Sequence, residues 1–163
     1  MNVGAAGSSL RIEPIDPHSD ELSALLDAYL AEIRATFGYQ DERAAPTVPE
    51  EFVPPHGVFL VVRDERGVAR GCGAVRMVDP STAEIKRMWL HPDLRGRGAG
   101  RDLLRALEAE AVGMGAERGV LDTHATLVAA IGLYLAAGWS EVPPYNDNAE
   151  ATHWFGKDLS APR

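Results

Sequence analysis

The sequence predicts an α/β fold in which a mixed β-sheet is flanked by helices, and three observations lead to it. β-rich runs joined by short turns fill the first half of the chain, the apolar pattern changes to helical spacing near residue 98, and a strand–helix–strand–helix–strand order follows. The early strands are expected to pair antiparallel, whereas the later order requires a right-handed crossover. The 163 residues, 45% of them hydrophobic, correspond to one domain.

The N-terminal part contributes a leader, a strand and a helix. Residues 1–9 have neither a basic start nor an apolar stretch, so we predict a flexible leader, with the single domain spanning residues 10–160. A weak alternation over residues 10–13 indicates a first strand. Ser19 is placed to cap a helix that Gly38 can end, with apolar residues at helical spacing: Leu22, Leu25, Leu26, Tyr29, Leu30 and Ile33. Four prolines between residues 39 and 55 then favour a surface loop or a short helix.

The remaining elements follow the same periodicities. Residues 58–62 and 68–78 are β-rich runs joined by a turn at 64–67, which predicts a hairpin, and a further strand is expected at 83–90. Helices are predicted at 98–114 and 127–137, with a short strand at 119–123 between them. A last hairpin is predicted near residues 139–142 and 151–159.

Composition argues against several classes of partner and site. The formal net charge of −8 argues against general affinity for nucleic acid or anionic membranes. The longest nearly apolar run is far shorter than the roughly 20 residues that cross a bilayer, so we expect a cytoplasmic protein. The single cysteine, Cys72, permits no internal disulfide and is predicted to lie in the core. Because the five histidines show no metal-ligand spacing, we predict no metal.

The stretch from Leu90 to Arg101 carries the strongest candidate site. Gly96, Gly98 and Gly100 precede a helix, which allows successive backbone N–H groups to point at one spot beside the positive end of that helix. Between residues 84 and 105, six Lys or Arg stand against three acids in an otherwise acidic chain, which indicates a specific anionic ligand. Neither the Walker A string nor the dinucleotide fingerprint is present. A plain strand-to-helix turn with a charged rim is the alternative.

The string Arg95-x-x-Gly98-x-Gly100 resembles the Q/R-x-x-G-x-G/A signature of the GCN5-related N-acetyltransferase (GNAT) family. Residues 83–92 resemble the preceding strand of bacterial members, and residues 130–139 resemble a later A-I-x-L-Y-x-x-x-G-F segment. The similarity covers at least residues 58–142, with departures at Leu127 and Trp139, where members often have Asn and Phe. The resemblance implies a GNAT-like fold of about six to seven strands and four helices. It also implies an acyltransferase that moves acetyl from acetyl-CoA to an amine by direct attack.

The resemblance also assigns roles to residues of this chain. Backbone N–H groups at Trp89 and Leu90 are expected to meet the thioester carbonyl, and the loop to hold the pyrophosphate through Arg95, Gly96, Arg97, Gly98, Ala99, Gly100 and Arg101. Glu84 resembles the carboxylate that takes the amine proton, with an ion pair to Lys86 or Arg87 as the alternative. Tyr134 resembles the general acid. We favour a hydrogen bond to the departing thiolate, because a tyrosine pKa near 10 exceeds a thiol pKa near 8.5. A core tyrosine is the alternative.

The implied acceptor is a small-molecule or peptide amine, with no nucleic acid or membrane partner, and a homodimer is left open. The acidic surface favours a cationic acceptor such as a polyamine, aminoglycoside, peptide N-terminus or lysine. Loop residues that we expect on the acceptor side are Phe37, Tyr39, Glu51, Tyr145 and Asn146, and His124 is the reserve base. Two other classes compete: a non-catalytic acyl-CoA-binding sensor module, and a polyanion-binding protein that uses the loop arginines.

Overall fold

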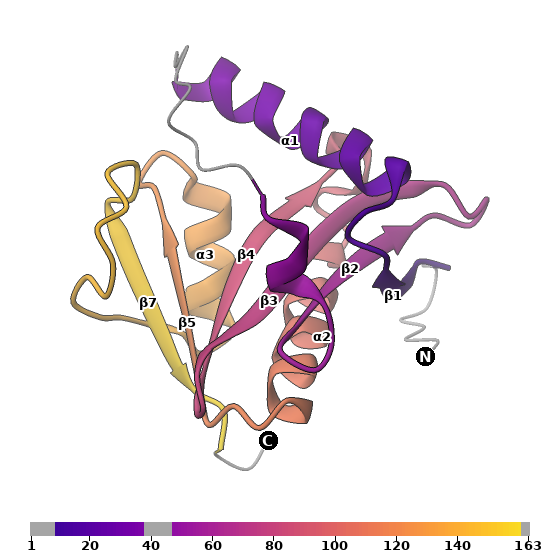
Figure 1. Cartoon of the computed structure of the whole chain (residues 1–163). Helices are drawn as coiled ribbons and strands as arrows, with labels where there is room; N and C mark the ends of the chain where they lie inside the picture. The colour runs from indigo at the N-terminus through magenta and orange to yellow at the C-terminus, as the bar shows by residue number, and fades with distance from the viewer. Residues whose placement is uncertain (1–8, 38–46, 161–163) are drawn as a thin grey trace.

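The computed structural model describes residues 9–37 and 47–160, and a seven-stranded mixed sheet organises them (Figure 1). The strand order is β1-β2-β3-β4-β5-β7-β6. The strands are β1 (Arg11–Ile15), β2 (Gly57–Arg63), β3 (Ala69–Asp79), β4 (Thr82–Leu90), β5 (Arg118–Thr123), β6 (Ser140–Glu141) and β7 (His153–Asp158). The helices are α1 (Asp20–Phe37), α2 (Ala99–Gly113) and α3 (Val128–Ala136), with short 3₁₀ turns η1 (Pro49–Phe52) and η2 (Pro92–Leu94).

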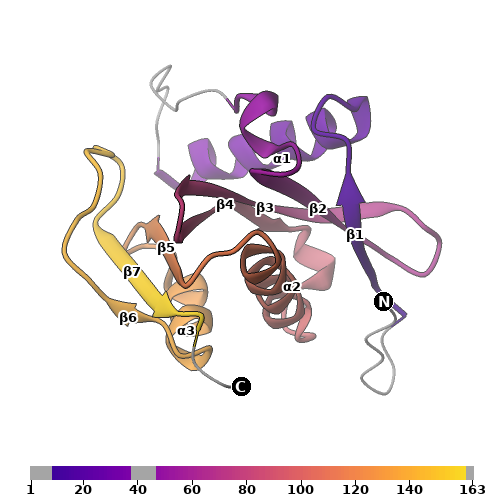
Figure 2. The same ribbon diagram turned by 60° about the horizontal axis from the view of Figure 1, so that its bottom comes forward.

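The helices cover the sheet on both faces. Figure 2 shows α1 on one side of the sheet and α2 with α3 on the other. Alternation along β2 builds both cores: Val58, Leu60 and Val62 pack on the α2 side, while Phe59 and Val61 pack on the α1 side. A strand that is buried on both faces explains why residues 58–62 form an uninterrupted apolar run.

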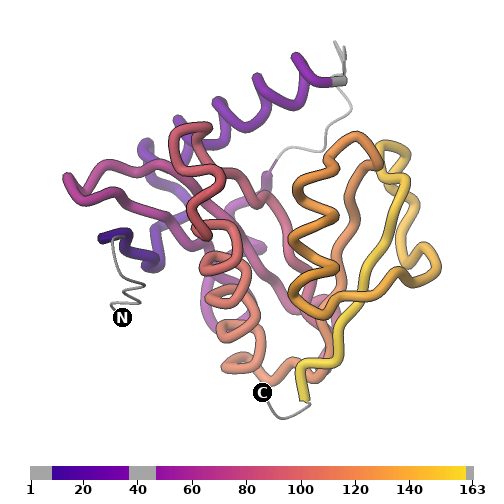
Figure 3. Tube along the Cα trace, turned by 180° about the vertical axis from the view of Figure 1, so that it is seen from behind, coloured from indigo at the N-terminus to yellow at the C-terminus, as the bar shows by residue number. Residues whose placement is uncertain are grey.

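Strands β4 and β5 separate soon after they meet. Their parallel pairing covers three residue pairs, Thr82–Glu84 against Arg118–Val120. Beyond this point the two strands diverge (Figure 1), and from behind α3 lies beside the gap (Figure 3). Because backbone groups along the diverging edges lose their ladder partners there, the gap is a place inside the sheet where a ligand can reach the main chain.

A β-bulge in β4 reverses which side of the sheet its residues face. Cys72 pairs with Trp89 and Ala74 with Lys86, so Arg87 and Met88 together oppose one residue of β3. Arg87 takes a positive φ of 57° there. Before the bulge, Glu84 and Lys86 face the α1 side; after it, Met88 and Leu90 pack against the core on the α2 side. One strand therefore presents side chains to both sides of the gap.

The predicted α/β fold class and the mixed sheet of about six to seven strands are confirmed. Three α-helices occur in the described ranges where about four were expected, and the proline-rich stretch contributes η1. Ser19 precedes α1, and its hydroxyl accepts from the Leu22 N–H at 3.3 Å. Gly38 and Tyr39 lie outside the described residues. Among the helices that the structure describes, none is long and apolar enough to cross a membrane.

Candidate active site

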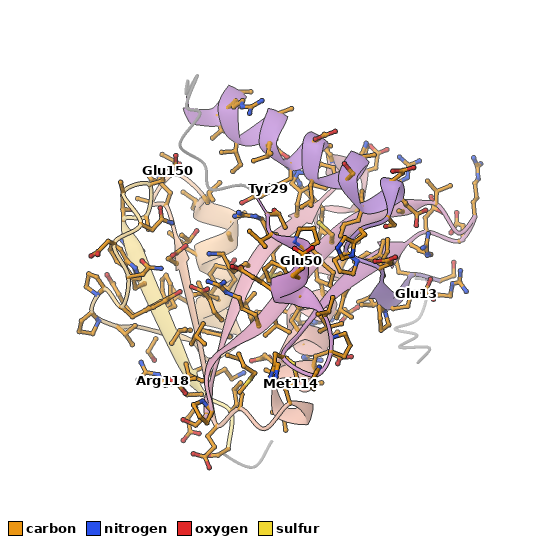
Figure 4. All side chains as sticks on the ribbon, viewed as in Figure 1. Glu13, Tyr29, Glu50, Met114, Arg118 and Glu150 are labelled. Carbon is orange, nitrogen blue, oxygen red and sulfur yellow. The ribbon has the colours of Figure 1, made fainter. Side chains whose placement is uncertain are left out.

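A cavity of about 180 Å³ occupies the gap between β4 and β5, and we call it the gap cavity. Its walls come from α1, the bulged part of β4, the end of β5, α3 and the loop before β7 (Figure 4 labels Tyr29 and Glu150). Its polar and charged lining includes Tyr29, Lys86, Arg87, Asp122, Tyr134 and Glu150.

The glycine loop ahead of α2 leaves its backbone amides free. Gly96 and Gly98 adopt φ of 76° and 80°, a left-handed conformation that favours glycine. Among the described residues, no backbone or side-chain acceptor meets the N–H groups of residues 96–98, and the first helical bond runs from the Asp102 N–H to the Gly98 carbonyl. A Cβ on Gly96 would have nothing within 4 Å, so the cradle is also open. These amides and the positive end of α2 can hold an anion such as a diphosphate.

Arg95 is turned away from that cradle. Its Nε and Nη2 donate to the Leu90 carbonyl at 3.0 and 2.9 Å, and Nη2 also donates to Glu32 of α1 at 2.6 Å. The indole N–H of Trp89 donates to the same Glu32 oxygen. The hydrogen bond from Arg95, more than any other contact, lowers the pKa of Glu32. Arg95 and Trp89 therefore join the end of β4 to α1, whereas Arg97 and Arg101 are exposed at the rim of the loop.

The backbone of Leu90 lies on the open edge of β4. The His91 N–H donates to the Arg70 carbonyl beside β3 at 2.7 Å. Because amides alternate along a strand, the Leu90 N–H faces the gap and the Trp89 N–H faces β3. Of the two amides singled out from the sequence, that of Leu90 is the one available to a ligand.

Tyr134 belongs to both the core and the gap cavity. It is 7% exposed, and its ring lies 6.0 Å from Phe155 and 6.4 Å from Trp139 between ring centres. Its hydroxyl has no hydrogen-bond partner among the residues that the structure describes, although the side chain lines the cavity. Burial, reinforced by Tyr29 and the charge of Asp122, raises the pKa of Tyr134, so the hydroxyl keeps its proton and can donate.

Glu84 is 3% exposed and firmly paired. Its Oε1 accepts from Arg76 at 3.0 and 3.1 Å, its Oε2 accepts from the Tyr145 hydroxyl at 2.7 Å, and Lys86 Nζ lies 3.7 Å from Oε1. The alternative reading of the sequence paired Glu84 with Lys86 or Arg87. Lys86 does lie near the carboxylate, but the principal partner of Glu84 is Arg76. Glu84 lines a second cavity of about 470 Å³ beside the gap, together with Tyr145 and Asn146. Its role as proton acceptor stays a prediction.

Asp122 is the carboxylate that the sequence reasoning missed. It lines the gap cavity, where its Oδ2 accepts from the Asn146 amide at 2.6 Å, and Asn146 Oδ1 accepts from the Trp154 indole at 2.9 Å. Its Oδ1 has no partner among the described residues. Leu121 packs in the core on the α2 side, so strand alternation places Asp122 on the opposite face. That alternation is the signal that could have found it.

The remaining residues that the sequence singled out lie in different parts of the structure. Cys72 is fully buried against α1, and burial raises the pKa of its thiol to about 12. His124 lines the gap cavity and its Nδ1 contacts the Thr126 hydroxyl at 2.9 Å. Glu51 forms an ion pair with Arg76. Tyr39 lies outside the described residues, as does the side chain of Phe37.

Comparisons with known proteins agree with one another. The family model described as acetyltransferase (GNAT) family matches residues 22–139. An uncharacterized N-acetyltransferase of Schizosaccharomyces pombe is 36% identical over 133 residues, which cover 79% of this chain and 80% of the relative. A GNAT-family acetyltransferase from Staphylococcus aureus Mu50 superposes with a TM-score of 0.78 at 15% identity, over 92% of this chain and 99% of that one. The structure of yncA, a putative acetyltransferase from Salmonella typhimurium with its cofactor acetyl-CoA, superposes with a TM-score of 0.65 at 19% sequence identity. The superposition covers 96% of this chain and 97% of that one.

Proposed function

The chain belongs to the acetyltransferase (GNAT) family and is an acyltransferase, and we propose that it transfers an acetyl group from acetyl-CoA to an amine by direct attack. The main support for acetyl-CoA as the acetyl donor is the set of backbone amides at residues 96–98, which have no acceptor among the described residues and lie ahead of α2. A diphosphate placed there would receive these N–H groups and the end of α2. The coenzyme found with yncA supports the same choice.

The residues present fit the coenzyme on one side of the gap. Gly96 and Gly98 supply the left-handed turns that aim the amides, and Arg97 and Arg101 add positive charge at the rim. The amide of Leu90 lies on the open edge of β4, where it would donate to the thioester carbonyl. Acetyl-CoA supplies the activated acetyl group; the protein supplies alignment and hydrogen bonds.

Transfer requires a neutral amine. A primary amine with a pKa near 10.4 is mostly protonated at neutral pH, so a carboxylate must take its proton directly or through water. Two carboxylates on the strands that border the gap face its α1 side: Glu84, which the resemblance assigns to this task, and Asp122, which lines the gap cavity itself. The attack forms the bond between nitrogen and the acetyl carbon and breaks the bond from that carbon to sulfur.

Tyr134 is the proposed partner of the departing sulfur. Since burial raises its pKa, full proton transfer to a thiolate is less favourable than in water, and a hydrogen bond is the main stabilisation, with the proton passing late. The ring packing against Phe155 fixes the side chain for this role.

A thiol-release assay tests the proposal. Purified protein with acetyl-CoA should release coenzyme A only when an amine from a broad panel is present, and calorimetry should show acetyl-CoA binding without any amine. Binding without turnover across the panel would instead support a non-catalytic acyl-CoA sensor. The variants Glu84→Gln and Asp122→Asn separate the two carboxylates: the true proton acceptor is the one whose loss lowers kcat and removes the acidic limb of the pH profile. A cytoplasmic location and a homodimer stay predictions.

A further inference from the structure

Charges of opposite sign line opposite walls of the gap cavity. The β4 wall carries Lys86 and Arg87, and the facing wall carries Asp122 of β5 and Glu150 of the loop before β7. The two cations and two carboxylates balance, although the whole chain has a formal charge of −8. The net charge of the protein is thus a poor guide to its acceptor, because the substrate meets this local and polarised lining first.

Lys86 is only weakly engaged by the protein. Its one ion pair within the described residues is with Glu84 Oε1 at 3.7 Å, beyond hydrogen-bond distance. That oxygen already accepts from two nitrogens of Arg76. Lys86 also lines both the gap cavity and its neighbour, with a quarter of its side chain exposed. An ammonium in this position retains donors for an anionic group that enters from either cavity.

Asp122 offers the complementary group on the other wall. The Trp154–Asn146–Asp122 chain of hydrogen bonds fixes its Oδ2, while its Oδ1 is without a partner among the described residues. A fixed carboxylate that retains an acceptor oxygen suits the amino group of a substrate, in either its ammonium or its neutral form.

We propose that the acceptor is a small amine that also carries a carboxylate, an α-amino acid or a close analogue, with its amine at Asp122 and its carboxylate at Lys86. The inference rests on the proposed acetyl transfer. A polyamine or aminoglycoside would bring additional positive charge against Lys86 and Arg87, and the cavity of about 180 Å³ suits a small molecule. The geometry therefore favours a zwitterion over the cationic acceptor expected from net charge.

The test uses matched acceptors in the thiol-release assay: phenylalanine, its amide and phenethylamine, with leucine, leucinamide and isoamylamine as a second set and spermidine as the polyamine. We expect kcat/KM for the free amino acid of at least one set to exceed that of its amide and its decarboxylated amine by about tenfold or more, since a charge-assisted hydrogen bond is lost. Equal rates for the decarboxylated amines, or a preference for spermidine, would overturn the inference while leaving acetyl transfer intact. Acetyl-CoA binding with no turnover of any amine would overturn both.

Two variants test whether Lys86 causes the preference for the amino acid over its decarboxylated amine. Lys86→Gln should raise KM for the amino acid about tenfold and should change kcat/KM for the decarboxylated amine much less, so the preference for the amino acid shrinks or disappears. Arg66→Gln, which removes an exposed cation from the β2–β3 turn, should leave both values unchanged. Calorimetry of acetyl-CoA checks that each variant is folded. A Lys86→Gln protein that binds acetyl-CoA normally and still prefers the amino acid would contradict the assignment.

Discussion

Substitution of Gly98 tests the coenzyme cradle most directly, because Ala and Asp at this position separate shape from charge. Gly98 has a φ of 80° and caps α2. A Cβ there would meet only the Arg101 guanidinium, at 3.4 Å, so space is not the obstacle. The left-handed conformation costs a non-glycine residue about 1–2 kcal/mol. For Gly98→Ala this cost appears either as lost stability or as a looser loop.

Lost stability and a looser loop can be told apart, because the first changes the melting temperature and the second changes the affinity for acetyl-CoA. If the loop keeps its shape, Gly98→Ala lowers the melting temperature by roughly 2–8 °C for a domain of this size. If the loop relaxes, stability is retained and acetyl-CoA affinity falls by roughly 5- to 30-fold. Aspartate tolerates the left-handed region better than alanine does, but it adds a negative charge to the cradle. Two unit charges 4 Å apart repel by about 1–4 kcal/mol, depending on solvent screening, so Gly98→Asp should lose roughly tenfold or more in affinity.

Calorimetry with acetyl-CoA and thermal unfolding without it measure both effects. Gly113→Ala is the matched control, because Gly113 ends α2 far along the helix from the loop, and a Cβ there meets nothing within 4 Å. It should leave affinity unchanged and should not lower stability, because Ala at a compatible helical position stabilises a protein by up to about 1 kcal/mol relative to Gly. A Gly98→Asp protein that binds acetyl-CoA within about threefold of the native affinity would refute the cradle and, with it, the proposed donor.

Three further outcomes are expected. Tyr134→Phe should lower turnover with little change in acetyl-CoA affinity, measured by thiol release and calorimetry; unchanged turnover would leave Tyr134 as a core residue alone. Lys157→Met should destabilise the protein on the order of 3 kcal/mol in urea unfolding, because it removes the ammonium that pairs with the buried carboxylate of Glu108 at 2.5 Å; a loss below about 1 kcal/mol would contradict this. Cys72, with a thiol pKa of about 12, should react with iodoacetamide at pH 8 roughly a thousand times more slowly than free cysteine; rapid labelling of folded protein would place it at the surface.

Much of the fold follows from local patterns that the sequence shows openly. Residues 58–62 are apolar throughout because β2 is buried on both faces, and the glycines at 96 and 98 mark left-handed turns that few other residues adopt. The free amides of the loop follow from the same glycines and the start of α2. These features could be predicted because each depends on residues close together in the chain.

Features set by pairing between distant segments could not be predicted. The bulge centres on Arg87, a residue type with no preference for positive φ, so nothing in the composition of β4 marks it. The pairing of Glu84 with Arg76 depends on the register of β3 against β4. The position of the Asp122 carboxylate depends on a hydrogen bond from Asn146, which lies 24 residues later in the chain. The same limit applies to acceptor charge, because the sum over the chain does not report which charges line a cavity.

Because of the bulge in β4, the residues in the two halves of that strand can change independently of each other in evolution. Positions 84 and 86 face the side of the sheet where we propose that the amine binds, whereas the side chains at positions 88 and 90, in the same strand, pack on the opposite side. Under the proposed function, substitutions at positions 84 and 86 would alter the preference for the amine and leave the packing at positions 88 and 90 in place. If the proposed function holds, proteins that keep this one extra residue could acquire new amine substrates and keep the same acetyl donor.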